Sequence, residues 1–442
     1  MRKVLLIAYV FPPLATSGAI RPLKFTKYLP KFGWQPIVLT VRKGDYWVID
    51  SSLLDEIPET ATVYRTHSWE LVNMREAKRA YDKVIHHKEG SRIKKVFFKF
   101  LRYAYLHLLI PDSKIGWLPF AVIGGQKIIK EEGIDIIIAT GGPWTNFLVG
   151  YLLSYFTHIP LILDYRDPWT HILHYRTKRL KRVLESRLEN RIQRRASRII
   201  AISSVLTAKL QTAYPYQDRD KFITITNGFD PEDFHNLTSP PPIGHSTFTI
   251  TYTGSFSGTR VPDFFLQGLQ AWLQDQPGIR TRIKVNFFGA MGEEYLQMIS
   301  SMGLWDVIEY CGQVPHREAV QAQANSHLLL LILELDPDVE KEALTAKIFE
   351  YLAARRPILA LVHPDGLAAQ LIRETRTGIV VAPRDVHGIR NALDKMYRAY
   401  CEGTIPYDPD DAVIAQYAYP NLARRLADVL NEVVSDKASA GK

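Results

Sequence analysis

Short, continuously apolar segments recur along the 442-residue chain and alternate with stretches of helical spacing. A strand that is buried on both faces has no polar side to alternate with, so such runs predict a parallel sheet covered by helices on both faces. The expected strands are residues 3–8, 36–40, 134–139, 160–164 and 199–203 in the first half, and 249–253, 284–288, 307–310, 328–333 and 357–362 in the second. The predicted fold class is therefore α/β.

The length and one linker indicate two domains. A chain of 442 residues is too long for one ordinary core and suits two domains of about 200 residues each. Residues 236–247 form the stretch richest in Pro and Ser and are the expected linker. We therefore expect Rossmann-like domains at 1–235 and 248–411 that face each other across a ligand-binding cleft, with a C-terminal helix at about 412–436 packing back onto the first domain.

Charge and cysteine content restrict the binding partners and the cellular compartment that we expect for the protein. The net charge of +9 is local, because residues 75–102 hold ten Lys or Arg against three acids and residues 176–198 hold ten against two. Such clusters indicate an anionic partner surface. Two cysteines give no disulfide framework, and no run of about 18 apolar residues predicts a membrane-spanning helix. The apolar start of the chain ends in Pro-Pro and is interpreted as a first strand, so a cytoplasmic location is expected.

Residues 342–361 carry the most specific chemistry. They are interpreted as a loop, a helix and a buried strand, with Glu342, Lys347 and Glu350 at the loop and the first turns of the helix. Free amides at a helix start and a nearby lysine can bind a diphosphate, and a glutamate one turn later can accept hydrogen bonds from a ribose diol. On spacing alone, an ordinary surface helix with solvated Glu and Lys side chains explains the pattern better.

This segment resembles the C-terminal signature of retaining glycosyltransferases of family 4, which have a GT-B fold of two Rossmann-like domains. The shared pattern is Glu, seven residues and Glu, with Lys-x-Phe-Glu-Tyr-Leu-Ala and a Pro-led strand. The resemblance implies that Glu342 lies by the donor sugar, that Glu350 binds the ribose, and that the helix start at Ala346 meets the donor. Further matches are the loop 9–21 with Gly18 and Arg21, the loop 140–143 with Gly142, the motif Asp164-Tyr-Arg166-Asp167-Pro-Trp169, the strand end at Gly254, and the loop 311–315 with Val314 near the base. The resemblance implies that Gly18, Gly254 and Val314 also bind the donor.

The chain departs from the family pattern around the diphosphate. Ser255 stands where an arginine is common, while Arg260 occupies the position of the family's lysine. We expect Lys347 to help compensate for the missing cation. A glycine-rich loop is also replaced by residues 336–340, so either Glu340 or Glu342 can approach the donor sugar.

The resemblance implies a retaining transfer of sugar from a UDP- or GDP-linked donor to a glycan or lipid-linked acceptor in bacterial surface-polysaccharide synthesis. Arg260, Lys347 and Glu342 are the expected catalytic residues. Arg21, Gly142, Asp164, Arg166, Asp167 and Trp169 are expected to line the acceptor side of the cleft, although a structural Arg–Asp pair explains the 164–167 motif equally well. No cofactor and no metal are expected, since the nucleotide sugar is a co-substrate and no Asp-x-Asp pair ends a strand.

Two alternatives stay open: a nucleotide-sugar epimerase of the same architecture, and a degenerate homologue that only binds nucleotide or membrane. The basic, aromatic stretch from Lys94 to Tyr105 is suited to a helix on an anionic lipid surface, so a peripheral position on the inner face of the cell membrane is expected. No recognition motif for nucleic acid accompanies the basic clusters, and nucleic-acid binding is not expected.

Overall fold

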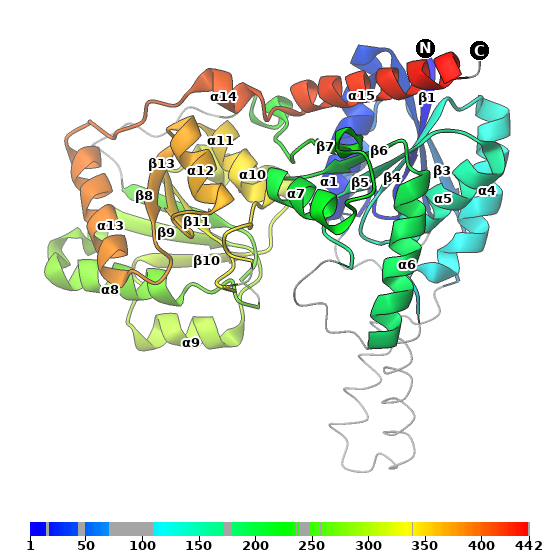
Figure 1. Ribbon diagram of the computed structural model, residues 1–442. Helices are drawn as coiled ribbons and strands as arrows, with labels where there is room; N and C mark the ends of the chain where they lie inside the picture. The colour runs from blue at the N-terminus through cyan, green and yellow to red at the C-terminus, as the bar shows by residue number, and fades with distance from the viewer. Residues whose placement is uncertain are drawn as a thin grey trace, which may run out of the picture. The chain divides into compact units, whose positions relative to one another are not determined.

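The computed structural model describes residues 1–14, 17–42, 49–69, 109–170, 179–235, 237, 247–256, 258–337 and 339–440. The chain divides into two compact units, one of residues 1–226 with 422–442 and one of residues 227–421. Each unit contains a parallel sheet with helices packed against it (Figure 1). The predicted α/β class is confirmed.

Among the described residues, the sheet of the first unit has seven strands in the order β3-β2-β1-β4-β5-β6-β7, and all neighbours are parallel. The strands are β1 (Arg2–Ile7), β2 (Trp34–Val41), β3 (Thr62–Thr66), β4 (Ile136–Thr140), β5 (Leu161–Tyr165), β6 (Arg198–Ala201) and β7 (Phe222–Thr224). The α-helices are α1 (Ser17–Tyr28), α4 (Leu118–Glu132), α5 (Thr145–Thr157), α6 (Arg179–Arg195), α7 (Ser204–Ala213) and α15 (Tyr419–Ala440).

The described part of the second unit has a six-stranded parallel sheet in the order β10-β9-β8-β11-β12-β13. Its strands are β8 (Phe248–Thr253), β9 (Ile283–Phe288), β10 (Ile308–Gly312), β11 (Leu328–Ile332), β12 (Ile358–Leu361) and β13 (Gly378–Val381). Its α-helices are α8 (Asp263–Asp275), α9 (Glu293–Ser301), α10 (His316–Ala324), α11 (Ala346–Ala354), α12 (Leu367–Thr375), α13 (Val386–Cys401) and α14 (Asp411–Ala415).

The central strand β11 shows why the apolar runs lack alternation. Leu330 and Ile332 pack into a core that includes α8 and α13, whereas Leu329 and Leu331 pack into a second core with α11 and α12. Figure 1 shows these two pairs of helices on opposite sides of the sheet. Both faces of the strand are therefore dry, and every side chain along it is apolar.

The strands that the apolar runs did not predict, β3, β7 and β13, each lie at the edge of a sheet. All five residues of β3 are partly exposed. β3 and β7 carry polar residues, as expected for edge strands that are only half covered, so their sequences lack the continuous apolar run on which the prediction depends. The sequence of β13 is Gly-Ile-Val-Val, a short apolar run that the prediction missed.

The division between the units differs from the expected boundary at residue 235. Residues from Asn227 onward belong to the second unit, where Phe229 packs in the core with Leu329 and forms an isolated bridge with Ala418. From Leu422 onward, α15 belongs to the first unit. Most of the expected linker, 236 and 238–246, lies outside the described residues.

Candidate functional site

The ammonium group of Lys347 is the centre of the predicted site in the second unit. Its Nζ lies 3.7 Å from the centroid of the Tyr252 ring, is buried, and makes no hydrogen bond with any described residue. Gly254, directly after β8, has a φ of +128°, and a Cβ on it would come within 2.5 Å of that Nζ. The glycine therefore leaves the space in which the ammonium lies.

The electrostatic surroundings of Lys347 disfavour its positive charge. Burial and the nearby Arg260 guanidinium hold the pKa of Lys347 well below its ordinary value of 10.5, against a smaller opposing effect of Glu350 and Glu334. A cation destabilised in this way gains from an anionic ligand that replaces its lost water. The arrangement is thus suited to binding an anion at the start of α11.

Arg260 is held by a partner that sequence reasoning missed. Its Nη2 forms an ion pair with Oε1 of Glu334, which follows β11. Its Nε is buried without a hydrogen-bond partner among the described residues. Since Glu334 precedes both residues 336–340 and the predicted 342–361 segment and belongs to no motif, only the fold reveals this pairing.

Glu350 lies one turn into α11, where His316 and Gln323 hold its carboxylate. The His316 Nε2 is 3.3 Å from Oε1 and the Gln323 Nε2 donates to Oε2 at 3.2 Å. Burial alone would raise the pKa of Glu350, but the hydrogen bonds from His316 and Gln323 outweigh it and lower the pKa below 4.5. The carboxylate is therefore an ionised acceptor at neutral pH, and it is only partly buried (26% exposed).

The beginning of α11 offers further groups to a ligand. Its N-cap residue, Thr345, makes no capping hydrogen bond, and its Oγ1 is buried without a partner in the described structure. Ala346 and Lys347 are the first two helical residues, so their amide groups lie at the positive end of the helix dipole. Val314 lies in the loop between β10 and α10, with a partly exposed side chain.

The two candidates for the first glutamate differ in their surroundings. Glu340 lies between His363, 3.9 Å from its Oε1, and Arg384, 3.6 Å from its Oε2. Glu342 is partly exposed in the turn that follows, where its amide donates to the Val339 carbonyl. Glu340 thus lies beside two basic side chains, whereas Glu342 lies in a partly exposed turn.

In the first unit, Arg21 and Asp164 form a buried pair. Arg21 donates through Nε and Nη2 to the Asp164 carboxylate at 2.8–3.1 Å, and through Nη1 and Nη2 to the carbonyls of Thr226 and Ile225. Asp164 also accepts from Thr140 Oγ1. Since both side chains are at least 95% buried, this pair joins α1, β5 and the end of the unit and contributes to structure rather than to ligand contact.

Arg166 connects the predicted glycine loops of this unit. Its Nε and Nη2 donate to the carbonyls of Gly141 and Gly142, and a Cβ on Gly18 would come within 2.0 Å of its Nη1. The guanidinium therefore lies between the start of α1 and the loop after β4, with the exposed Asp167 next to it in sequence. These residues all follow the carboxyl ends of strands, where α/β folds bind ligands.

Trp169 is fully buried and stacks on Trp144, with ring centroids 5.4 Å apart. The indole therefore supports the loop after β5 from inside the core. Phe147 packs against the same ring at 6.3 Å. The bulky aromatic residues of this motif hold the loop in place, while Arg166 and Asp167 are its accessible members.

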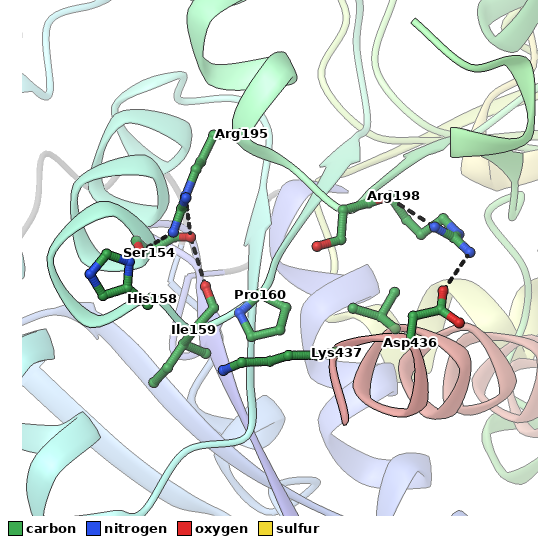
Figure 2. Close-up of a pocket in the computed structure, with 10 residues that line it drawn as sticks. Ser154, His158, Ile159, Pro160, Arg195, Arg198, Asp436 and Lys437 are labelled. Carbon is green, nitrogen blue, oxygen red and sulfur yellow. Dashed lines mark hydrogen bonds and ion pairs between the residues drawn. The ribbon is translucent and has the colours of Figure 1, made fainter. Parts of the chain in front are cut away.

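A cavity of about 400 Å³ lies elsewhere in the first unit, and Figure 2 shows Arg195, Arg198 and Lys437 around it. Arg195 donates to Oγ and the carbonyl of Ser154, and Arg198 pairs with Asp436. The cavity adjoins residues that precede β5 and β6, at the opposite edge of the sheet from Arg166. It is not part of the predicted site.

Two family models match the chain, one in each half. The model described as Glycosyltransferase Family 4 matches residues 92–233. The model described as Glycosyl transferases group 1 matches residues 247–399, which include Gly254, Arg260, Lys347 and Glu350. The two matches follow each other in the order of the two units.

Individual proteins resemble the chain more distantly. An exopolysaccharide phosphotransferase of Streptomyces coelicolor is 27% identical over 171 residues, which is 38% of this chain and 16% of that protein. A glycosyltransferase from Rickettsia africae ESF-5 is 15% identical with a TM-score of 0.62 over 98% of both chains. HepE from Anabaena, solved in complex with UDP-glucose, is 16% identical with a TM-score of 0.57 over the full length of both. These structural likenesses and the two parallel-sheet units show the expected GT-B fold.

Proposed function

We propose that the chain, which has the GT-B fold and matches two glycosyltransferase family models over residues 92–233 and 247–399, is a glycosyltransferase. In this proposal it transfers a sugar from a UDP- or GDP-linked donor to a glycan or lipid-linked acceptor, with retention of anomeric configuration, in surface-polysaccharide synthesis. The observation that carries the proposal is the pairing, at the start of α11, of an ionised carboxylate with a buried ammonium that makes no hydrogen bond to the described residues. This arrangement is suited to a molecule that has a diphosphate next to a ribose.

In the proposed reaction, the bond between the sugar C1 and the diphosphate oxygen breaks, the acceptor oxygen bonds to C1, and the acceptor hydroxyl loses its proton. Lys347 and the first amides of α11 stabilise the negative charge that develops on the leaving diphosphate. Glu350 accepts hydrogen bonds from the ribose. Arg260, positioned by Glu334, provides the second positive charge, and Glu342 lies by the donor sugar.

We assign the acceptor side to the first unit. Gly142, Arg166 and Asp167 form its accessible group at the carboxyl edge of the sheet, while Arg21, Asp164 and Trp169 support that group from within. Gly18 is buried against the Arg166 guanidinium, and its predicted contact with the donor stays a prediction. The name of the Streptomyces coelicolor relative concerns exopolysaccharide, which supports a polysaccharide product. The UDP-glucose complex of the Anabaena protein makes UDP-sugars the first donors to test.

Incubation of the purified protein with a panel of UDP- and GDP-sugars and candidate acceptors tests the proposal. We expect acceptor-dependent release of the nucleoside diphosphate and a product whose anomeric configuration, measured by NMR coupling constants, equals that of the donor. Conversion of the donor without release of nucleoside diphosphate indicates the epimerase alternative. Nucleotide binding without turnover of any donor indicates a degenerate homologue.

Gly18→Ala is expected to lower transfer about tenfold, because the new Cβ would force Arg166 away from the carbonyls of Gly141 and Gly142. Such a displacement removes a positioned charge-assisted contact worth roughly 1.5–3 kcal/mol. The change is measured as kcat/KM for the acceptor. Gly278→Ala is the control, since a Cβ there meets nothing within 4 Å. Equal activities of the two variants would contradict this role of Arg166.

The membrane prediction for Lys94 to Tyr105 concerns residues outside the described part of the chain, and it stays a prediction. No helix among the described residues has the length and apolarity needed to cross a bilayer. We propose that the protein acts at the cytoplasmic face of the cell membrane, where a lipid-linked acceptor is accessible to a nucleotide-sugar donor.

A further inference from the structure

Helix α6 has an unusual distribution of charge between its buried and exposed faces. Its two acidic residues, Glu185 and Glu189, are both completely buried. The residues with exposed basic side chains are Arg179, Arg182, Arg187, Arg191 and Arg194. The exposed face of this helix therefore carries five positive charges and no negative one.

Several of these arginines make no polar contact within the part of the chain that the structure describes. Arg179, Arg187 and Arg191 form no hydrogen bond or ion pair with another described residue. Arg194 lies over the ring of Tyr216, which is itself 72% exposed. A row of guanidinium groups along a helix about 25 Å long is thus directed to solvent.

The first turns of α6 also expose aliphatic side chains. Leu180 is 71% exposed, Leu184 42% and Val183 39%. Exposed leucine and valine interleaved with arginine, on a face without exposed acidic residues, are typical of helices at a lipid interface, where the aliphatic groups enter the acyl boundary and the cations meet phosphate.

The position of α6 in the fold relates this face to the candidate site. The helix connects β5 to β6, which are parallel neighbours. Its N-terminal end therefore lies toward the carboxyl edge of the sheet, the edge that also holds Arg166 (Figure 1). The exposed aliphatic groups belong to that end of the helix.

We propose that the exposed face of α6 binds the surface of a bilayer that contains anionic phospholipids, with Leu180, Val183 and Leu184 inserted among the headgroups. The biological role of this surface rests on the proposed function, because an enzyme that acts on a lipid-linked acceptor has to bind at the membrane that holds it. Charge complementarity selects the partner: each basic residue near an anionic leaflet strengthens binding, and the aliphatic cluster adds a contribution that salt does not screen.

Vesicle flotation with the full-length protein tests the proposal. Wild type is expected to float with vesicles of phosphatidylcholine and phosphatidylglycerol but not with phosphatidylcholine alone. The triple variant Arg179→Gln, Arg187→Gln, Arg191→Gln is expected to bind at least tenfold more weakly, since three favourable charges are lost. A control that removes three exposed positive charges elsewhere in the first unit, Lys127→Gln, Lys130→Gln, Arg219→Gln, is expected to bind like wild type.

A second variant, Leu180→Ser, Val183→Ser, Leu184→Ser, separates a membrane from other polyanions. It is expected to lose the vesicle binding that persists at high salt and to leave binding to duplex DNA unchanged. Equal loss of vesicle binding in the control and arginine variants overturns the proposal, as does vesicle binding that is indifferent to the serine changes. Release of nucleoside diphosphate with a water-soluble acceptor is expected to be unchanged in all three variants, so that a failure of the proposed function and a failure of membrane binding give different results.

Discussion

Replacing Lys347 with methionine is expected to lower the rate of sugar transfer about 10²–10³-fold and to leave the protein at least as stable to heat as wild type. The rate is expected to fall because the variant lacks the cation that we propose to stabilise the leaving diphosphate. The stability does not fall, because methionine fills a similar volume and removes a buried charge whose Nζ has no hydrogen-bond partner among the described residues. Steady-state kinetics and thermal denaturation measure the two effects.

The pH dependence of stability provides a separate test of the same residue. The pKa of Lys347 is lowered in the folded protein and near 10.5 in the unfolded chain. Between these values the unfolded chain binds more protons, so the stability of wild type rises with pH. The advantage of Lys347→Met over wild type is therefore expected to shrink as the pH rises toward 10.5, measured by urea unfolding at each pH.

Lys341→Met is the matched control, since Lys341 is exposed and only six residues away. It is expected to change neither the rate nor the pH dependence of stability. A Lys347→Met protein that transfers sugar within about twofold of wild type would exclude Lys347 from stabilising the transition state.

The sequence predicted the framework of the site better than its electrostatics. Continuous apolar runs identified the central strands, because those strands are buried on both faces, whereas the edge strands β3 and β7 lacked this signal. The segment containing Lys347 and Glu350 was identified because its motif lies within one loop and helix. The spacing alone favoured an ordinary surface helix, and only the family resemblance predicted a donor-binding site at these residues.

The partners of these side chains come from distant parts of the chain. Tyr252 lies under Lys347, Glu334 pairs with Arg260, and His316 hydrogen-bonds to Glu350, although no motif connects them. These contacts depend on which strands are neighbours in the sheet, a property that local spacing does not contain. Whether Asp164 contacts a ligand or has a structural role could be decided only from the fold, because the burial of its pair with Arg21 identifies that pair as structural.

Glu350→Ala is expected to weaken binding of UDP or GDP, whichever the donor panel selects, by about 10–100-fold. The carboxylate is ionised at neutral pH because His316 and Gln323 keep its pKa low, and hydrogen bonds to a charged acceptor are worth about 1.5–3 kcal/mol. The fold should tolerate the change. The carboxylate of Glu350 is 26% exposed and the ring of His316 30% exposed, so water can replace the lost acceptor.

A nucleotide without the 2′-hydroxyl identifies the group that Glu350 binds. Wild type is expected to bind the 2′-deoxynucleoside diphosphate more weakly than the ribonucleotide, whereas Glu350→Ala should bind both alike, as measured by calorimetry. Glu309→Ala is the control, since it removes an exposed glutamate on β10 that is paired with Lys284 on β9. This variant is expected to prefer the ribonucleotide as strongly as wild type does. If Glu350→Ala retained the full preference for the ribonucleotide, the ribose would lie elsewhere, and the start of α11 would bind the diphosphate alone.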